Sequence, residues 1–173
     1  KSAEGFIDKI DDRLSDIEDE ISKLNTQIQA LDADFNSLAP FKGLNYTLKG
    51  IYDMDFFKYR FGKIPKVNFD KFESYLDPDI NAIFITTLAA TEYVYGVFFA
   101  PNEYFEEVAK DFKNINFDEI AIAKKYKDFP DKECENILSQ KEDLQKQVQA
   151  KEDSINDVIE ESKTKLVSAI RRI

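Results

Sequence analysis

The 173-residue sequence lacks several residue types on which common active sites depend. It has no histidine, which removes most general-base triads and most zinc sites. Its one cysteine, Cys134, allows neither an intrachain disulfide nor a thiolate metal cage. Five glycines without a glycine-rich run leave no loop that could cradle a phosphate. We therefore expect no catalytic residue, no metal site and no cofactor, and we interpret Cys134 as an ordinary helix residue.

Basic residues and long apolar runs are also scarce. The chain has 24 basic and 34 acidic side chains, and the charge of -10 argues against binding to nucleic acid or to an anionic membrane surface. The longest apolar candidate, Ile80–Pro101, is interrupted by Asn81 and Glu92, so no membrane-spanning segment is predicted. No signal peptide is visible. The sequence begins without methionine and its apolar pattern continues to Ile173, so we expect a piece of a longer protein.

The first 38 residues carry apolar side chains at alternating steps of three and four, which is the seam of a coiled coil. The seam consists of Ile7, Ile10, Leu14, Ile17, Ile21, Leu24, Ile28, Leu31, Phe35 and Leu38. Pro40 cannot continue a helix, so residues 1–39 are predicted to form the first coiled-coil helix.

Residues 131–173 repeat this pattern less regularly, with Lys141, Lys151 and Ser162 at seam positions. No glycine or proline interrupts them, so a second helix of about 40 residues is expected. Two such helices bracketing one domain predict an antiparallel hairpin, in which each helix covers the seam of the other. Pairing of each helix with a separate chain is the alternative.

The middle of the chain, residues 40–130, has a different composition and holds all eight tyrosines and 13 of the 15 phenylalanines. Residue patterns predict strands over 56–64, 82–88, 93–100 and 118–124. One helix is expected after Asn68, ending at Asp77-Pro78-Asp79, and another after Pro101. The order β-α-β-β-α-β predicts an α+β fold, with a ferredoxin-like lobe at the end of the long antiparallel coiled-coil helical hairpin.

Two predicted strands of this lobe are apolar on both faces, so the sheet face away from the lobe helices needs a cover. We expect Leu44–Asp53 or the end of the coiled coil to supply it, with a protein partner as the alternative. In the first strand, Lys58 and Arg60 alternate with aromatic residues. We expect both cations to point away from the lobe helices and to contact a partner.

Several short segments, in their order and spacing, resemble subunit I of the rotary A/V-type ATPases, the counterpart of the eukaryotic subunit a, in its bacterial form. The segments are Leu38-Ala39-Pro40-Phe41, Phe57–Pro65, Tyr93–Phe99, Pro101-Asn102-Glu103-Tyr104, Phe117-Asp118-Glu119-Ile120 and Asp128-Phe129-Pro130. The resemblance covers the whole chain, most clearly residues 38–165. It departs from the family pattern at Lys124–Lys127 and at the polar seam residues of the second helix.

The resemblance implies a non-catalytic N-terminal cytosolic domain of a stator subunit, which links the soluble ATPase sector to the ion-translocating membrane sector. It implies two partners, namely a peripheral-stalk heterodimer of subunits E and G or H, and the remainder of subunit I with its membrane domain. No ion-path residue of the family falls in this sequence, and no direct membrane contact by this chain is expected. Two other interpretations stay open. One is a generic coiled-coil arm with a globular interaction tip, of the chromosome-structural or chaperone type. The other is a ferredoxin-like ligand-binding regulatory domain.

Overall fold

The computed structural model describes residues 2–74 and 81–171, and its contacts divide the chain into two compact units. The first unit combines the N-terminal residues up to Asp32 with the residues from Leu138 onward. The second unit is Ala33–Ile137. Both boundaries fall inside long helices, so each long helix contributes residues to both units.

These long helices are α1 (Ser2–Leu38) and α5 (Pro130–Arg171). Proline marks one end of each. Pro40, which has no N–H to continue the hydrogen-bond ladder, follows the last turn of α1. Pro130 opens α5, where the first backbone N–H groups have no partner within the helix in any case. Both predicted long helices are therefore present, and no helix in the described residues is long and apolar enough to cross a membrane.

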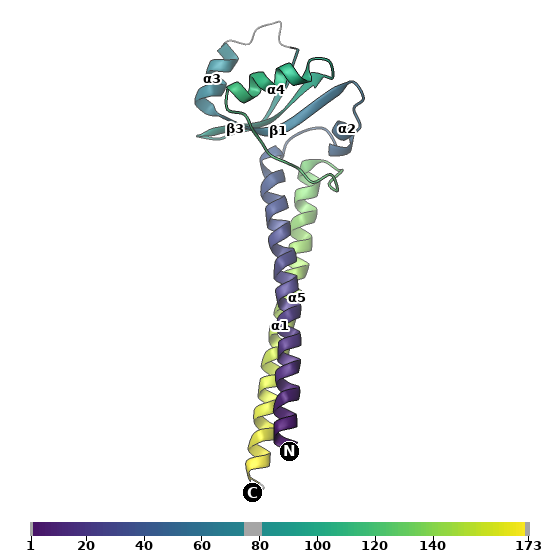
Figure 1. The fold of residues 1–173 in the computed structure, drawn as a ribbon, viewed down its shortest axis with the longest axis vertical. Coiled ribbons are helices and arrows are strands. Elements are labelled where there is room, and N and C mark those ends of the chain that lie inside the picture. The colour runs from purple at the N-terminus through teal and green to yellow at the C-terminus, as the bar shows by residue number, and fades with distance from the viewer. Residues whose placement is uncertain (1, 75–80, 172–173) are drawn as a thin grey trace. The chain divides into compact units, whose positions relative to one another are not determined.

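Within the first unit, α1 and α5 lie side by side and run in opposite directions (Figure 1). Within the described parts of both helices, two ion pairs join them. Lys151 Nζ lies 2.5 Å from Glu20 Oε2, and Lys141 Nζ lies 2.6 Å from Asp32 Oδ1. The predicted pairing of the two helices within one chain is confirmed, and the two seam lysines of α5 each have an acidic partner on α1.

The α1 seam is only partly shielded from solvent. Ile7 is 52% exposed, whereas Leu38 is fully buried. Between these two, the seam residues are half-buried: Ile10, Leu14, Ile17, Ile21, Leu24, Ile28, Leu31 and Phe35. On α5, Ser162 is also half-buried, and its hydroxyl donates to the carbonyl oxygen of Val158 at 2.6 Å. A polar residue in the seam is thus tolerated because its own helix satisfies it.

The second unit contains a four-stranded antiparallel sheet with the strand order β2-β3-β1-β4. The strands are β1 (Phe57–Pro65), β2 (Ile83–Ala89), β3 (Tyr93–Pro101) and β4 (Asp118–Glu119). The first three match the predicted strands. The fourth was predicted over 118–124, and this is wrong beyond Glu119, because the backbone leaves the edge of β1 after Ile120.

Two helices, α3 (Lys66–Ser74) and α4 (Phe105–Asn114), lie on one face of this sheet (Figure 1). Together with the strands they follow the predicted order β-α-β-β-α-β and give a mixed α+β fold. The core on this face is aromatic, and the rings of Phe98 and Phe112 stack with their centroids 4.1 Å apart. The predicted end of the first lobe helix at Asp77-Pro78-Asp79 lies outside the described residues.

Two glycines let aromatic rings approach this face closely. Gly62 of β1 and Gly96 of β3 lie opposite each other in the sheet. A Cβ atom on Gly62 would lie 2.4 Å from the Phe117 ring, and one on Gly96 would lie 2.7 Å from the Phe84 ring. Each ring therefore occupies the space that a side chain would need, which explains glycine at these two strand positions.

The opposite sheet face is partly covered by η1 (Ala39–Phe41), which follows the first long helix, and by α2 (Leu48–Tyr52), which lies in the expected segment Leu44–Asp53. The Phe41 ring meets the Phe61 ring edge-on, with centroids 5.0 Å apart. The hydroxyl of Thr87 donates to a main-chain carbonyl of η1 at 2.9 Å. The doubly apolar strands are thus covered by helices on one face and by a shorter segment on the other.

Candidate interaction surface

Lys58 and Arg60 lie together on the sheet face that carries α4. The Arg60 guanidinium carbon is 4.9 Å from the centroid of the Phe105 ring, and Lys58 Nζ is 5.6 Å from it. Phe105 belongs to the core beneath α4. The expectation that the two cations point away from the lobe helices is therefore wrong. The cause is that the aromatic face of β1 packs against η1 and α2, with Phe61 on Phe41 and Tyr59 on Tyr52, so side-chain alternation alone does not say which face α3 and α4 cover.

The main-chain N–H and C=O groups of β1 point alternately to the two sides of the strand, toward β3 and toward β4. Asn102 N donates to Phe56 O at 3.0 Å and Lys66 N donates to Glu92 O at 2.9 Å, which shows that even-numbered residues of β1 bond toward β3. Ile120 N donates to Phe61 O at 2.8 Å on the other side. The odd-numbered residues therefore turn their N–H and C=O groups toward β4.

The strand β4 is too short to pair with the first half of β1. Its two residues lie opposite Gly62 and Lys63. In the described part of the chain, no strand lies beside the outer edge of Phe57–Arg60. In its place, a cavity of about 430 Å³ opens between β1 and the segment 119–124. The main-chain N–H and C=O of Tyr59 point toward this cavity.

The charge around this cavity differs in sign from that of the whole molecule. Three basic side chains, Lys58, Arg60 and Lys124, and one acidic side chain, Glu119, line it. Arg60 Nε lies 3.6 Å from Glu119 Oε2, and both side chains are about half exposed, so this ion pair is weak. A locally basic groove on a chain of charge -10 is a candidate site for an anionic partner.

Tyr52 of α2 supplies the other wall of this groove. Its hydroxyl oxygen is buried and, among the described residues, has no hydrogen-bond partner. Burial raises the pKa of Tyr52 to about 12, and the neighbouring Tyr59 and Glu133 add to the effect. At neutral pH the group is therefore a neutral hydroxyl with a free donor, which costs free energy while it stays unpaired. Sequence patterns gave no sign of this residue, nor of Lys124 or Glu119. We call the groove bordered by β1, Tyr52 and residues 119–124 the β1 edge groove.

A second cavity, of about 400 Å³, lies between α2 and the outer sheet edge and is mostly apolar. Tyr46 and Met54 line one side, and Ile83 and Phe99 line the other. Ile83 is 60% exposed at the free edge of β2. This surface offers apolar contact but no charged side chain.

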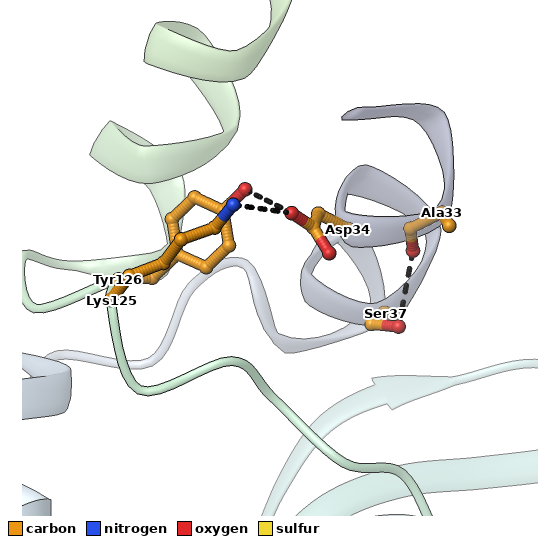
Figure 2. Close-up of polar contacts among 5 residues, drawn as sticks. All are labelled: Ala33, Asp34, Ser37, Lys125 and Tyr126. Atoms are coloured by element: carbon orange, nitrogen blue, oxygen red, sulfur yellow. Dashed lines mark hydrogen bonds and ion pairs between the residues drawn. The ribbon is translucent and has the colours of Figure 1, made fainter. Parts of the chain in front are cut away.

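A polar cluster joins the end of α1 to the loop before α5, within the second unit. Figure 2 shows Lys125 and Tyr126 both pointing at Asp34. The hydroxyl of Tyr126 donates to Asp34 Oδ2, and Lys125 Nζ lies 3.3 Å from the same oxygen. One turn along α1, the hydroxyl of Ser37 donates to the carbonyl of Ala33 at 3.1 Å. Burial raises the pKa of Tyr126 far above its ordinary value, and the hydrogen bond to Asp34 raises it further. We call Asp34, Lys125 and Tyr126 the polar clamp.

The remaining candidates for chemistry are inert. Cys134 is buried near the start of α5, and burial raises the pKa of its thiol, so it is protonated at neutral pH. The described residues contain no group of three or more acidic or cysteine side chains placed to hold a metal ion.

These features define a class of protein with an antiparallel helix pair and a separate mixed α/β unit built on a four-stranded antiparallel sheet. No model of a known protein family matches the sequence, and no curated protein matches it.

Among solved structures, the chain is similar to the crystal structure of the cytoplasmic N-terminal domain of subunit I, the homologue of subunit a, of V-ATPase. The TM-score is 0.58, with 8% sequence identity over 88% of this chain and 51% of the other. The chain thus spans about half the length of that structure. At this identity the likeness shows the fold, and the fold alone.

Proposed function

We propose that the chain is a non-catalytic part of the stator of a rotary A/V-type ATPase, corresponding to a piece of the cytoplasmic N-terminal domain of subunit I. One observation carries this proposal, which is the fold likeness to that domain over 88% of the chain. The order of short segments along the sequence, which resembles the same subunit, supports it independently of the coordinates.

In this role the two units have different tasks. The helix pair provides a stiff rod, since ion pairs and a shared seam couple its two helices along their length. The α/β unit provides a docking surface. We propose that it binds a peripheral-stalk heterodimer of subunits E and G or H on the cytoplasmic side of the membrane. The remainder of subunit I, with its membrane domain, is the second proposed partner.

Two finer structural assignments belong to the same proposal. The strand order and the position of α3 and α4 on one sheet face support a ferredoxin-like topology for the lobe. The proposed domains are a coiled-coil helix over 1–39, a lobe over 40–130 and a returning helix over 131–173. Lys58 and Arg60 remain the predicted stalk contact, but they act from the β1 edge groove and not from the face opposite α4.

The proposal is tested by purification of the tagged full-length protein from detergent-solubilised membranes of its own cells. Identified rotary-ATPase subunits are then quantified by mass spectrometry. We expect the stalk subunits and the ATPase catalytic subunits to be enriched at least tenfold over an untagged strain. If no rotary-ATPase subunit purifies with the full-length protein, the stator role is excluded and the interpretation as a generic coiled-coil arm is favoured.

A matched pair of variants then addresses the docking surface. Lys58→Glu/Arg60→Glu reverses two charges at the β1 edge groove. Lys110→Glu/Lys132→Glu makes the same change in net charge at two exposed positions of the same unit that do not line the groove. We expect the first pair to reduce the yield of stalk subunits severalfold and the second to leave it unchanged. Equal yields from both variants would move the stalk contact away from the groove.

A further inference from the structure

The β1 edge groove has the geometry of a missing strand. Among the residues that the structure describes, none pairs with the outer edge of Phe57–Arg60 as a strand, and β4 stops after two residues although the chain continues beside the cavity. An unpaired edge presents a row of N–H and C=O groups at strand spacing, and an extended peptide can complete such a row. The backbone groups of Phe57 and Tyr59 are the ones that face the gap, because the odd-numbered residues of β1 turn toward β4.

The two sides of the groove differ in chemistry. Lys58 and Arg60 lie on the α4 side of the sheet, where both contact the Phe105 ring. Tyr52 and Tyr59 lie on the opposite side, with ring centroids 5.9 Å apart. Successive side chains of an added strand would point alternately to these two sides. One set of positions would therefore meet cations, and the other would meet the aromatic rings of Tyr52 and Tyr59.

We propose that the β1 edge groove binds an extended acidic segment of another protein, which adds as a strand beside Phe57–Arg60. Acidic residues at alternate positions of the segment face Lys58 and Arg60, and the residues between them face Tyr52 and Tyr59. The inference rests on the proposed stator function in one respect only, which is the identity of the protein that supplies the segment.

Charge complementarity selects this occupant. The groove carries three basic side chains and one acidic side chain, whereas the whole chain has a charge of -10. Glu119 pairs weakly with Arg60 in the free protein and competes with an incoming carboxylate. The other outer strand of the described sheet, β2, lacks this charge complementarity, because its residues from Ile83 to Ala89 carry no charge. Single-stranded RNA would match the charge but not the row of unpaired backbone groups.

The first experiment uses a fluorescein-labelled nine-residue peptide of alternating glutamate and valine, titrated with the 173-residue chain and followed by anisotropy. We expect binding that weakens as salt is raised. We expect Lys58→Glu/Arg60→Glu to weaken it about tenfold or more, and Glu119→Gln to strengthen it. The control Lys110→Glu/Lys132→Glu should stay within about twofold of the parent, since exposed charges outside the groove contribute little. Equal binding of a lysine-valine peptide would overturn the proposal.

The second experiment alters the peptide and not the protein, so no variant can fail to fold. A series of peptides carries one N-methyl group each, moved along the sequence one residue at a time. Methylation removes the N–H that a strand would donate to β1. Strand addition predicts that methylation weakens binding at every second residue and has little effect between them. If methylation had the same effect on binding at every position, or if an RNA oligonucleotide competed as well as the parent peptide, binding would be simple charge attraction and the proposal would be overturned.

The outcomes separate this inference from the stator proposal. If the peptides fail to bind while stalk subunits still purify with the full-length protein, strand addition is wrong and the stator role stands. If the alternating peptide binds with the expected pattern but no rotary-ATPase subunit purifies, the groove is a docking site for an acidic segment of a different complex.

Discussion

The polar clamp gives a prediction whose size can be worked out from its contacts. Tyr126→Phe removes one hydroxyl and leaves the ring in place, so no cavity forms. A hydrogen bond to a charged group contributes about 1.5–3 kcal/mol. The lower end applies, because the Asp34 side chain is 26% exposed and keeps Lys125 at 3.3 Å after the change. We therefore expect the free energy of unfolding of the second unit to fall by about 1.5 kcal/mol.

A double-mutant cycle isolates this contact. Tyr126→Phe, Asp34→Ala and the double variant are unfolded in urea and followed by near-ultraviolet circular dichroism, which reports the aromatic core of the α/β unit. We expect a coupling free energy of about 1 kcal/mol. Ser37→Ala is the matched control, since its hydroxyl bonds only to the carbonyl of Ala33 within an exposed turn. A coupling below about 0.3 kcal/mol, the usual error of additivity, would refute the clamp.

Three further predictions concern the helix pair, the sheet and alkaline pH. Lys151→Glu places a like charge beside Glu20 and should lower the thermal midpoint of the helical signal, and Glu20→Lys in the same chain should restore it; no recovery would mean that the ion pair contributes nothing. Gly96→Ala should lower the free energy of unfolding by about 2–3 kcal/mol, because its Cβ would lie 2.2 Å from the carbonyl oxygen of Ile85. A urea midpoint equal to that of the wild type would contradict this. The folded protein favours the protonated hydroxyl of Tyr126, whose pKa is raised above its unfolded value of about 10. This contribution to stability is complete below that pH and is lost above it, so stability to urea should decline as pH rises. Tyr126→Phe should show a smaller decline.

The long helices and most of the strands could be predicted from the sequence because each follows a local period. Apolar residues from Ile10 to Leu38 repeat with heptad spacing, and the same residues are half-buried or buried in the structure. Aromatic alternation in 56–64 and the β-rich runs after Ala82 identified three strands in the same way. A period is a property of neighbouring residues, so tertiary contacts are not needed to see it.

The side of the sheet on which Lys58 and Arg60 lie could not be predicted in this way. The aromatic face of β1 packs against η1 and α2, whereas α4 lies over the face that carries Lys58 and Arg60. Which face α4 covers depends on tertiary packing and not on the alternation itself. The length of β4 was also missed, because Ile120 and Ile122 have strong strand propensity although the backbone leaves the edge of β1 after Ile120. The strand propensity of these residues is overridden here, because the chain has to leave the sheet to reach the start of α5.

The polar clamp left no pattern at all in the sequence. Asp34 and Tyr126 are 92 positions apart and belong to segments with unrelated periods. The unpaired hydroxyl of Tyr52 is equally invisible, since one tyrosine among eight is not distinguished by its neighbours. Sites made from single residues of distant segments require the three-dimensional arrangement, and both the clamp and the β1 edge groove are of this kind.

The two ion pairs that join α1 to α5 in the described residues have a consequence for the register of the helix pair. Moving α5 along α1 by one heptad would preserve apolar contact along the seam, because the pattern repeats every seven residues. Such a slip would displace the helices by about 10 Å. It would also carry Lys141 away from Asp32 and Lys151 away from Glu20, leaving two half-buried cations without their partners. The ion pairs thus fix the register of two helices whose apolar pattern repeats. A helix pair built this way resists sliding of one helix along the other, which apolar packing alone would not ensure.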